Sequence, residues 1–301
     1  MKSPLTTKQT LIKIERFHMT FKKIKNYPYM KISKLLLIVV LAFATSCEKV
    51  IDVDLETAKP RLVVEASINW YENTTGNEQK IKLSTTTDYY STTIPPVTDA
   101  SVYITNSSGD VFNFIQEETP GTYKCNSFVP VVGETYNLTV VYKGEVYTAT
   151  DELLNTPTIT RVEQKNDAGP LGNQTEVKFF FNDLVDETNQ YFARIDDPYK
   201  VIPEYGVIED RFFENNEMFG LYFSEDFKTG DTIKFTLNGI TRNYYNYMNI
   251  LLAQTGTNSA GPFSTPTSTI RGNVINQTNF DNFALGYFRL SKTSFEEYII
   301  E

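Results

Sequence analysis

Histidine is almost absent from the 301-residue sequence, and cysteine is rare: His18 is the only histidine, and Cys47 and Cys125 are the two cysteines. His18 precedes an export signal, so we expect the mature chain to have no histidine. This excludes Ser–His and Cys–His nucleophilic systems, histidine general bases and histidine-bound zinc or copper. With Cys47 acylated, no intrachain disulfide is possible. Cys125 lies in a strand-like run, so we predict that it is a buried structural cysteine.

The apolar run near the N-terminus is too short to span a bilayer. Leu35–Phe43 contains nine residues, whereas a spanning helix needs about 20. Lys31 and Lys34 precede this run, and the small residues 44–46 follow it, directly before Cys47. This order is typical of a secretory signal, and the cysteine that ends it is similar to the bacterial lipobox. We therefore predict that residues 1–46 are removed and that Cys47 carries a lipid.

The mature chain has little positive charge. Residues 1–46 hold nine of the 28 Lys and Arg residues but one of the 37 acidic residues, so 19 basic and 36 acidic residues remain, a net charge of −17. Such a chain repels nucleic acid, and we expect contact with a membrane through the lipid. Residues 1–29 are unlike a leader, and we interpret Met30, or Met19, as the true translation start.

Short strands with period-2 alternation dominate the first half of the mature chain. Residues 47–60 are predicted to form a short acidic tether. From Leu62 to Ile68, apolar residues alternate with polar ones, and about seven such runs follow one another up to residue 152. Turns recur about every ten residues, which is typical of an antiparallel β-sandwich. We predict an Ig-like or transthyretin-like β-sandwich over residues 61–155.

The second half, residues 156–301, is predicted to be a second β-rich domain with one helix, so the fold class is all-β. Tyr244, Met248 and Leu251 lie at helical spacing within Thr241–Gln254. The predicted strands are Thr158–Glu163, Glu176–Asn182, Tyr191–Ile195, Gly206–Phe213, Phe219–Phe223, Thr232–Asn238 and Phe283–Leu290.

Several motifs, in order and spacing, resemble the DUF4249 family of Bacteroidetes lipoproteins. The motifs are Cys47–Asp54, Leu62–Glu65, Asp99–Val102, Gly109, Gly121–Tyr123, Gly133–Leu138, Tyr147–Ala149, Tyr245, Gly261–Pro266, Asn273 and Gly286–Phe288. The resemblance implies an outer-membrane lipoprotein that is accessory to a TonB-dependent receptor, and it supplies no catalytic residue or cofactor. Residues 48–52 contain acids but no dense acidic run, and we favour the cell-surface face slightly over the periplasmic face.

Carboxylates are the one catalytic group present in quantity. A carbohydrate-active enzyme needs two of them about 5–10 Å apart, and three local pairs are candidates, although solvated turns explain them as well. Calcium prefers oxygen ligands, so Asp183 and Asp186 form a weak calcium candidate. The candidate pairs are Asp183 with Asp186, Asp196 with Asp197, and Glu209 with Asp210.

Aromatic side chains are the remaining candidates for ligand or partner contact. We expect Tyr244 to be core, whereas Tyr245 and Tyr247 are more exposed candidates on the helix. Phe263 lies between two prolines in a stiff loop that either docks a partner or covers the core. Thr232, in Asp231–Ile233, is similar to an O-glycosylation acceptor.

We therefore predict a non-catalytic accessory or binding partner of a TonB-dependent receptor in nutrient capture or uptake, without a cofactor, and the association with the receptor is what the family resemblance implies. A carboxylate-based carbohydrate-active enzyme and a structural or adhesive surface lipoprotein are the alternatives.

Overall fold

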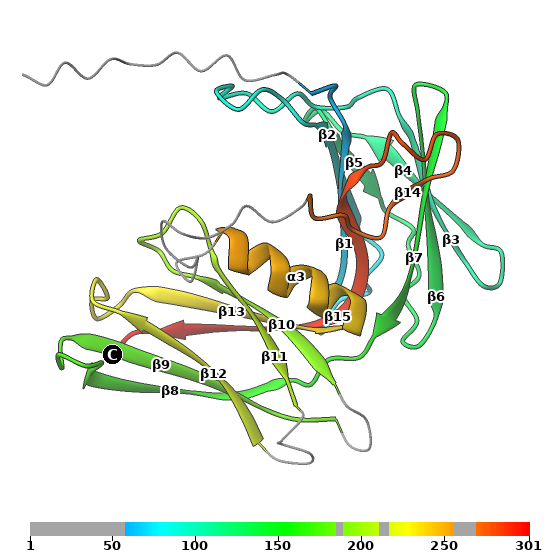
Figure 1. Cartoon of the computed structure of the whole chain (residues 1–301). Helices are drawn as coiled ribbons and strands as arrows, with labels where there is room; N and C mark the ends of the chain where they lie inside the picture. The colour runs from blue at the N-terminus through cyan, green and yellow to red at the C-terminus, as the bar shows by residue number, and fades with distance from the viewer. Residues whose placement is uncertain (1–57, 185–188, 211–216, 256–268) are drawn as a thin grey trace, which may run out of the picture. The chain divides into compact units, whose positions relative to one another are not determined.

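The computed structural model describes residues 58–184, 189–210, 217–255 and 269–301 (Figure 1). Cys47, Asp186 and Phe263 lie outside these ranges. The described chain is mostly β, as predicted, and α3 (Arg242–Thr255) is the one helix within it. No helix of the described residues is long and apolar enough to cross a membrane.

Seven strands occupy the first half of the described chain, which confirms the number that the alternation predicts. In β1, the inward-facing residues Leu62, Val64 and Ala66 are at most 3% exposed, while Glu65 and Ser67 are exposed. Period-2 burial therefore fixes which face of the strand packs on the core. The strands are β1 (Leu62–Tyr71), β2 (Gln79–Thr85), β3 (Ser101–Asn106), β4 (Val111–Gln116), β5 (Thr122–Cys125), β6 (Thr135–Tyr142) and β7 (Glu145–Leu154).

The second half contains further strands around α3, which begins and ends within one residue of its predicted bounds. The last strand continues beyond the predicted range Phe283–Leu290, to Ile299. The prediction ended too early because Ser291 and Thr293 are buried polar residues that break the apolar pattern. The strands are β8 (Ile159–Ala168), β9 (Gln174–Asn182), β10 (Gln190–Asp196), β11 (Glu204–Glu209), β12 (Glu217–Ser224), β13 (Thr232–Ile240), β14 (Ile275–Asn276) and β15 (Leu285–Ile299).

The strands pair in two sheets. One has the order β11-β10-β13-β15-β1-β2-β5-β4-β3-β6-β7-β14, and the other is β12-β9-β8. The first and last strands, β1 and β15, lie side by side and pair in parallel from Val63↔Leu285 to Tyr71↔Thr293 (Figure 1). β15 also pairs in parallel with β7, whereas the other described strand pairs are antiparallel, which is the direction expected for the first half of the mature chain.

The buried apolar side chains form three clusters. The first joins β1–β7 with residues of the C-terminal segment, including Phe288 and Leu290. The second lies among β8–β10, β12 and β13, and the third lies under α3. β15 contributes to the first cluster through Phe288 and to the third through Tyr287. One strand thus belongs to clusters in both halves of the described chain, and the predicted domain boundary at residue 156 stays a prediction. Cys125 is 2% exposed and has a free thiol, as expected.

Candidate functional site

Helix α3 is held by a polar start and an apolar stripe. Thr241 precedes the helix, and its Oγ1 accepts the backbone N–H of Tyr244 at 3.4 Å, which is the bond of an N-cap residue. Tyr244 and Met248, one turn apart, are buried as predicted. The stripe packs on Phe192 of β10 and Tyr287 of β15, so α3 covers the face of the sheet that β15 shares with β10.

Segment 269–273 crosses β15 at very short range, and two glycines make this possible. A Cβ on Gly272 would lie 1.6 Å from the carbonyl oxygen of Gly286. Next to it, the Asn273 side chain accepts the Phe288 N–H at 2.8 Å and donates to the Phe288 carbonyl at 2.7 Å. The side-chain amide thus satisfies the backbone of β15 at the crossing. Asn273 and Gly286–Phe288, which carry the family resemblance, therefore have a structural role here.

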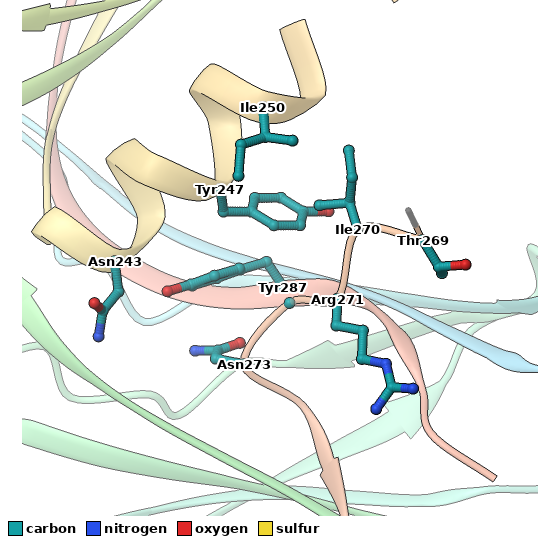
Figure 2. A pocket seen from close by; sticks show the side chains of 9 residues that line it. Asn243, Tyr247, Ile250, Thr269, Ile270, Arg271, Asn273 and Tyr287 are labelled. Carbon is teal, nitrogen blue, oxygen red and sulfur yellow. The ribbon is translucent and has the colours of Figure 1, made fainter. Parts of the chain in front are cut away.

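An open pocket lies between α3 and segment 269–273. Asn243, Tyr247 and Ile250 form the helix wall, since residues at this spacing share one helix face. Tyr287 lines it from β15, and its ring centroid is 4.9 Å from that of Tyr247. The cavity volume is about 700 Å³, within the range of small-molecule sites. Figure 2 shows the two tyrosine rings between the helix and the segment, and the Arg271 side chain leading away from them.

The two tyrosines of the pocket stay protonated at physiological pH. Burial raises the pKa of Tyr247, and burial followed by the negative charge of Asp151 raises the pKa of Tyr287. Both hydroxyls are therefore neutral and able to donate and accept hydrogen bonds, although that of Tyr287 already bonds to Thr241. The ring of Tyr247, the less buried of the two, can stack on a flat ligand. The pocket suits binding of a small ligand with an apolar face and polar groups.

A buried arginine lies beside the pocket. Arg289 is two residues after Tyr287 on β15, and therefore on the same face of the strand. It is 6% exposed, and its Nε and Nη1 have no hydrogen-bond partner. Its guanidinium is 5.5 Å and 5.6 Å from the ring centroids of Tyr244 and Phe192. The aromatic faces and the Asp151 carboxylate offset part of the cost of burying this cation.

Asp151 is expected to make the stability of the protein depend on pH. Burial raises the pKa of Asp151 to about 7, and the charge of Arg289 lowers it only in part. Because the pKa of an unfolded aspartate is about 4, the folded protein binds the proton more tightly than the unfolded chain does. The free energy of unfolding therefore falls as the pH rises from about 4 to about 7. We expect this decrease in the free energy of unfolding to be about 2 kcal/mol smaller in Asp151→Asn than in the wild type, after allowing for the partial exposure of the carboxyl.

Urea unfolding of the wild type and of Asp151→Asn at pH 4.5, 6 and 7.5 measures this effect. Glu118→Gln is the control, since Glu118 is an exposed carboxylate. Parallel pH profiles for the wild type and Asp151→Asn would show that Asp151 is not the group responsible.

The helix tyrosines predicted as contact residues differ in position. Tyr247 lines the pocket, whereas Tyr245 is half-buried at the edge of the third cluster, with the Arg242 guanidinium 5.6 Å from its ring. Their role in ligand contact stays a prediction. Thr232 begins β13 and is half-buried, and its glycosylation also stays a prediction.

The described members of the candidate acidic pairs contact other residues of the chain. Asp197 accepts the hydroxyl of Tyr222 at 2.7 Å and is 4% exposed. Asp196 is paired with Arg194, and Glu209 with Arg242. Among the residues that the structure describes, no group of three or more His, Cys, Asp or Glu side chains could hold a metal ion. In each of the two pairs whose members are both described, one carboxylate thus forms an ion pair with an arginine, whereas Asp186 lies outside the described residues.

Asp183 instead lies next to Asp210. Asp183 accepts the hydroxyl of Tyr191 at 2.6 Å, and Asp210 accepts the backbone N–H of Asn189 at 2.8 Å. One oxygen of each carboxyl, Asp183 Oδ2 and Asp210 Oδ1, is buried without a partner. Burial and the nearby Asp210 raise the pKa of Asp183. Asp183 is 7% exposed and Asp210 is 0% exposed, so both carboxyl groups are buried.

The fold and pocket define a mostly β protein with an aromatic pocket under a single described helix. Residues 48–296 match the model of the domain of unknown function DUF4249. The chain belongs to this family, and the sequence resemblance is confirmed.

Other comparisons add no functional information. No curated protein matches the chain. Solved structures with some similarity include a cytokine receptor complex (8% identity, 60% of this chain and 86% of that chain, TM-score 0.25). A two-domain fibronectin type III segment of chicken tenascin is also similar (8% identity, 61% of this chain and 92% of that chain, TM-score 0.20). So is a DUF4785 family protein of Legionella pneumophila (9% identity, 62% of this chain and 54% of that chain, TM-score 0.24). TM-scores this low support no conclusion about fold or function.

Proposed function

We propose that this chain is a lipid-anchored outer-membrane protein that assists a TonB-dependent receptor in nutrient capture, without catalysing a reaction itself. Cys47 is the anchor in this proposal, and the first domain is an Ig-like or transthyretin-like sandwich. The observation that carries the proposal is the pocket beside α3. It is open, about 700 Å³ in volume and lined by Tyr247, Tyr287 and Asn243, which are suited to holding a ligand.

The chemistry of the pocket favours binding over catalysis. A general base needs a pKa near the working pH and access to the substrate. The tyrosine pKa values are raised above their ordinary value, and no aspartate or glutamate is among the described lining residues. Tyrosine rings and side-chain amides supply stacking and hydrogen bonds to a neutral ligand without supplying a nucleophile.

A receptor partner would explain why a capture protein is tethered to the membrane. An anchor holds the pocket close to the barrel and raises its effective concentration there. The mature chain has a net charge of −17, which makes direct attraction to anionic head groups unfavourable and leaves the lipid as the main membrane contact. This partner is proposed on the strength of the family resemblance.

The test is a mild-detergent pull-down of the C-terminally tagged protein from native outer membranes, followed by mass spectrometry of proteins and of small molecules released on denaturation. We expect a stoichiometric TonB-dependent barrel in the eluate and at least one enriched small molecule. Cys47→Ala is expected to lose the membrane fraction and the barrel while it remains folded, because it lacks the anchor.

The variant Ile250→Trp distinguishes ligand binding in the pocket from binding of the receptor partner. Ile250 is 49% exposed on the helix wall, so a larger side chain narrows the pocket without entering the core. We expect the small molecule to be lost and the barrel retained. Phe295→Trp, at a site 42% exposed on β15 outside the pocket, is the matched control. A folded, lipidated protein that brings down no barrel would contradict the accessory role and favour the enzyme or surface-structure alternatives.

A further inference from the structure

The loop between β2 and β3 exposes large apolar side chains to solvent. Tyr89 is 84% exposed, Tyr90 is 74% exposed and Ile94 is 69% exposed. The two tyrosine rings contact each other edge to face, with centroids 5.2 Å apart. None of the three side chains belongs to the clusters of the described core, so packing within the described chain does not account for them.

The base of this loop is well fixed. Thr86 donates its backbone N–H to the Arg61 carbonyl, and Arg61 donates its backbone N–H to Thr86 Oγ1, each at 2.9 Å. At the other end of the loop, Thr85 N–H donates to Pro95 O at 2.9 Å. The loop that carries these side chains therefore extends from a hydrogen-bonded base.

A second exposed aromatic residue is connected to the same point. The Arg61 guanidinium donates to the carbonyl oxygens of Asp281 and Phe283, at 3.0 and 3.4 Å, in the loop before β15. Phe280, in that loop, is 71% exposed. Arg61 thus ties two loops with exposed apolar side chains to one region, which we call the tether-end surface: Arg61, Tyr89, Tyr90, Ile94, Arg271, Phe280 and Phe283.

The two cations of the tether-end surface contact one aromatic ring. The guanidinium groups of Arg61 and Arg271 lie 3.7 Å from the centroid of the Phe283 ring, each as a cation–π contact. Neither forms an ion pair among the residues that the structure describes. Arginine guanidinium groups are well suited to lipid phosphates, and exposed tyrosines are well suited to the interfacial layer.

The anchor lies close to this surface along the chain. Arg61 follows Cys47 by fourteen residues, and a fully extended chain of this length spans at most about 50 Å. The membrane that holds a lipid on Cys47 is therefore within reach of the tether-end surface. Amphipathic tyrosines gain most at such an interface, where the ring leaves water and the hydroxyl stays hydrated.

We propose that Tyr89, Tyr90, Ile94 and Phe280 insert into the interfacial layer of the membrane that holds the lipidated Cys47, and that this second contact orients the protein. The proposal rests on the anchor of the proposed function. Arg61 and Arg271 then meet lipid phosphates, while Asp88 and Asp281, the acids of the same two loops, are exposed and remain in water.

The test uses the lipidated full chain in phosphatidylethanolamine–phosphatidylglycerol vesicles that contain brominated phospholipid. Trp70 is replaced by phenylalanine to remove the only natural tryptophan, and Tyr90→Trp is introduced as the reporter. We expect its emission to shift to shorter wavelength and to be quenched at least twofold by the brominated lipid. Val201→Trp in the same background is the matched control, because Val201 is fully exposed elsewhere, and we expect no quenching there.

The outcomes separate this proposal from the anchor. If protein with Cys47 lipidated floats with the vesicles while Tyr90→Trp and Val201→Trp are equally unquenched, the anchor stands and the tether-end surface does not meet the membrane. If the lipidated protein does not float, the proposed function itself fails. Serine at positions 89, 90 and 94 is expected to abolish a quenching signal from Phe280→Trp, whereas serine at the exposed Leu171, Val201 and Ile202 is not.

Discussion

Gly286→Ala is expected to lower the free energy of unfolding by about 3 kcal/mol or more. Gly286 has φ +90°, and an added Cβ would lie 2.0 Å from the carbonyl oxygen of Val64. Gly286 pairs with Val64 in the parallel ladder between β1 and β15, so the clash forces the first and last strands apart. The left-handed backbone costs about 1–2 kcal/mol, and overpacking adds roughly 1–3 kcal/mol.

Gly133→Ala is the matched control for this effect. Gly133 has φ +79°, close to that of Gly286, but nothing lies within 4 Å of its added Cβ. We expect a loss of about 1 kcal/mol from backbone strain alone. Urea unfolding followed by circular dichroism measures both variants, with comparable m-values as the check on two-state behaviour. Equal losses in the two variants would mean that the β1–β15 contact absorbs the methyl group.

Several residues of the closing motif have structural roles around this contact. Gly286 permits the approach of β1, Gly272 permits the crossing of segment 269–273, and Asn273 bonds to the backbone of Phe288. All three lie around Tyr287, which forms part of the pocket. The closing motif therefore builds the scaffold of the candidate site, and Asn273 and Tyr287 also line the pocket.

Local patterns made most of the secondary structure predictable. Tyr244 and Met248 at helical spacing located α3 within one residue, because amphipathic spacing reports which face is buried. The second half of β15 was missed because Ser291, Thr293 and Ser294 are buried. Their hydrogen bonds to Thr156, Asn238 and the Ile159 N–H satisfy them in the interior, and such partners cannot be read from a period.

The parts of the candidate site that could not be predicted from the sequence depend on contacts between residues far apart in the chain. Tyr247 was identified as an aromatic residue on the predicted helix, but its neighbour Tyr287 belongs to a strand that α3 covers. Arg289 and Asp151 come from different strands, and a lone charge in an alternating run indicates an exposed position. Parallel pairing of β1 with β15 has no local signature, because it depends on the whole chain closing.

The pair Asp183–Asp210 leads to the second large prediction: Asp210→Asn is expected to stabilise the protein at pH 7 by about 1–3 kcal/mol. Asp210 Oδ2 accepts the Asn189 N–H, and Oδ1 has no partner. In the variant, the amide oxygen keeps the first bond, and the NH₂ group takes the second position. There it donates to Asp183 Oδ2, which is within hydrogen-bonding reach of residue 210. One substitution thus removes a buried like charge and satisfies a buried acceptor.

The dependence on pH distinguishes this explanation from a general effect of charge. The pKa of Asp183 is raised in the folded state, chiefly by burial and then by Asp210. The wild type therefore loses stability as pH rises from about 4, the unfolded value, through the raised folded value. Asp210→Asn lowers the folded pKa of Asp183, so the gain should be small near pH 4 and grow towards pH 7. Asp99→Asn, at an exposed acid, should show no such growth.

Calcium tests the other interpretation of these carboxylates. If Asp183 and Asp210 held a cation, millimolar CaCl₂ would raise the melting temperature of the wild type, and Asp210→Asn would lose that response and become less stable than the wild type in calcium. We expect no calcium response in either protein, because calcium takes 6–8 oxygen ligands and, among the described residues, Asp183 and Asp210 do not belong to a group of three or more metal-ligating side chains. A shared proton, in contrast, satisfies both unpartnered oxygens at once, and the amide introduced by Asp210→Asn reproduces that bond without depending on pH.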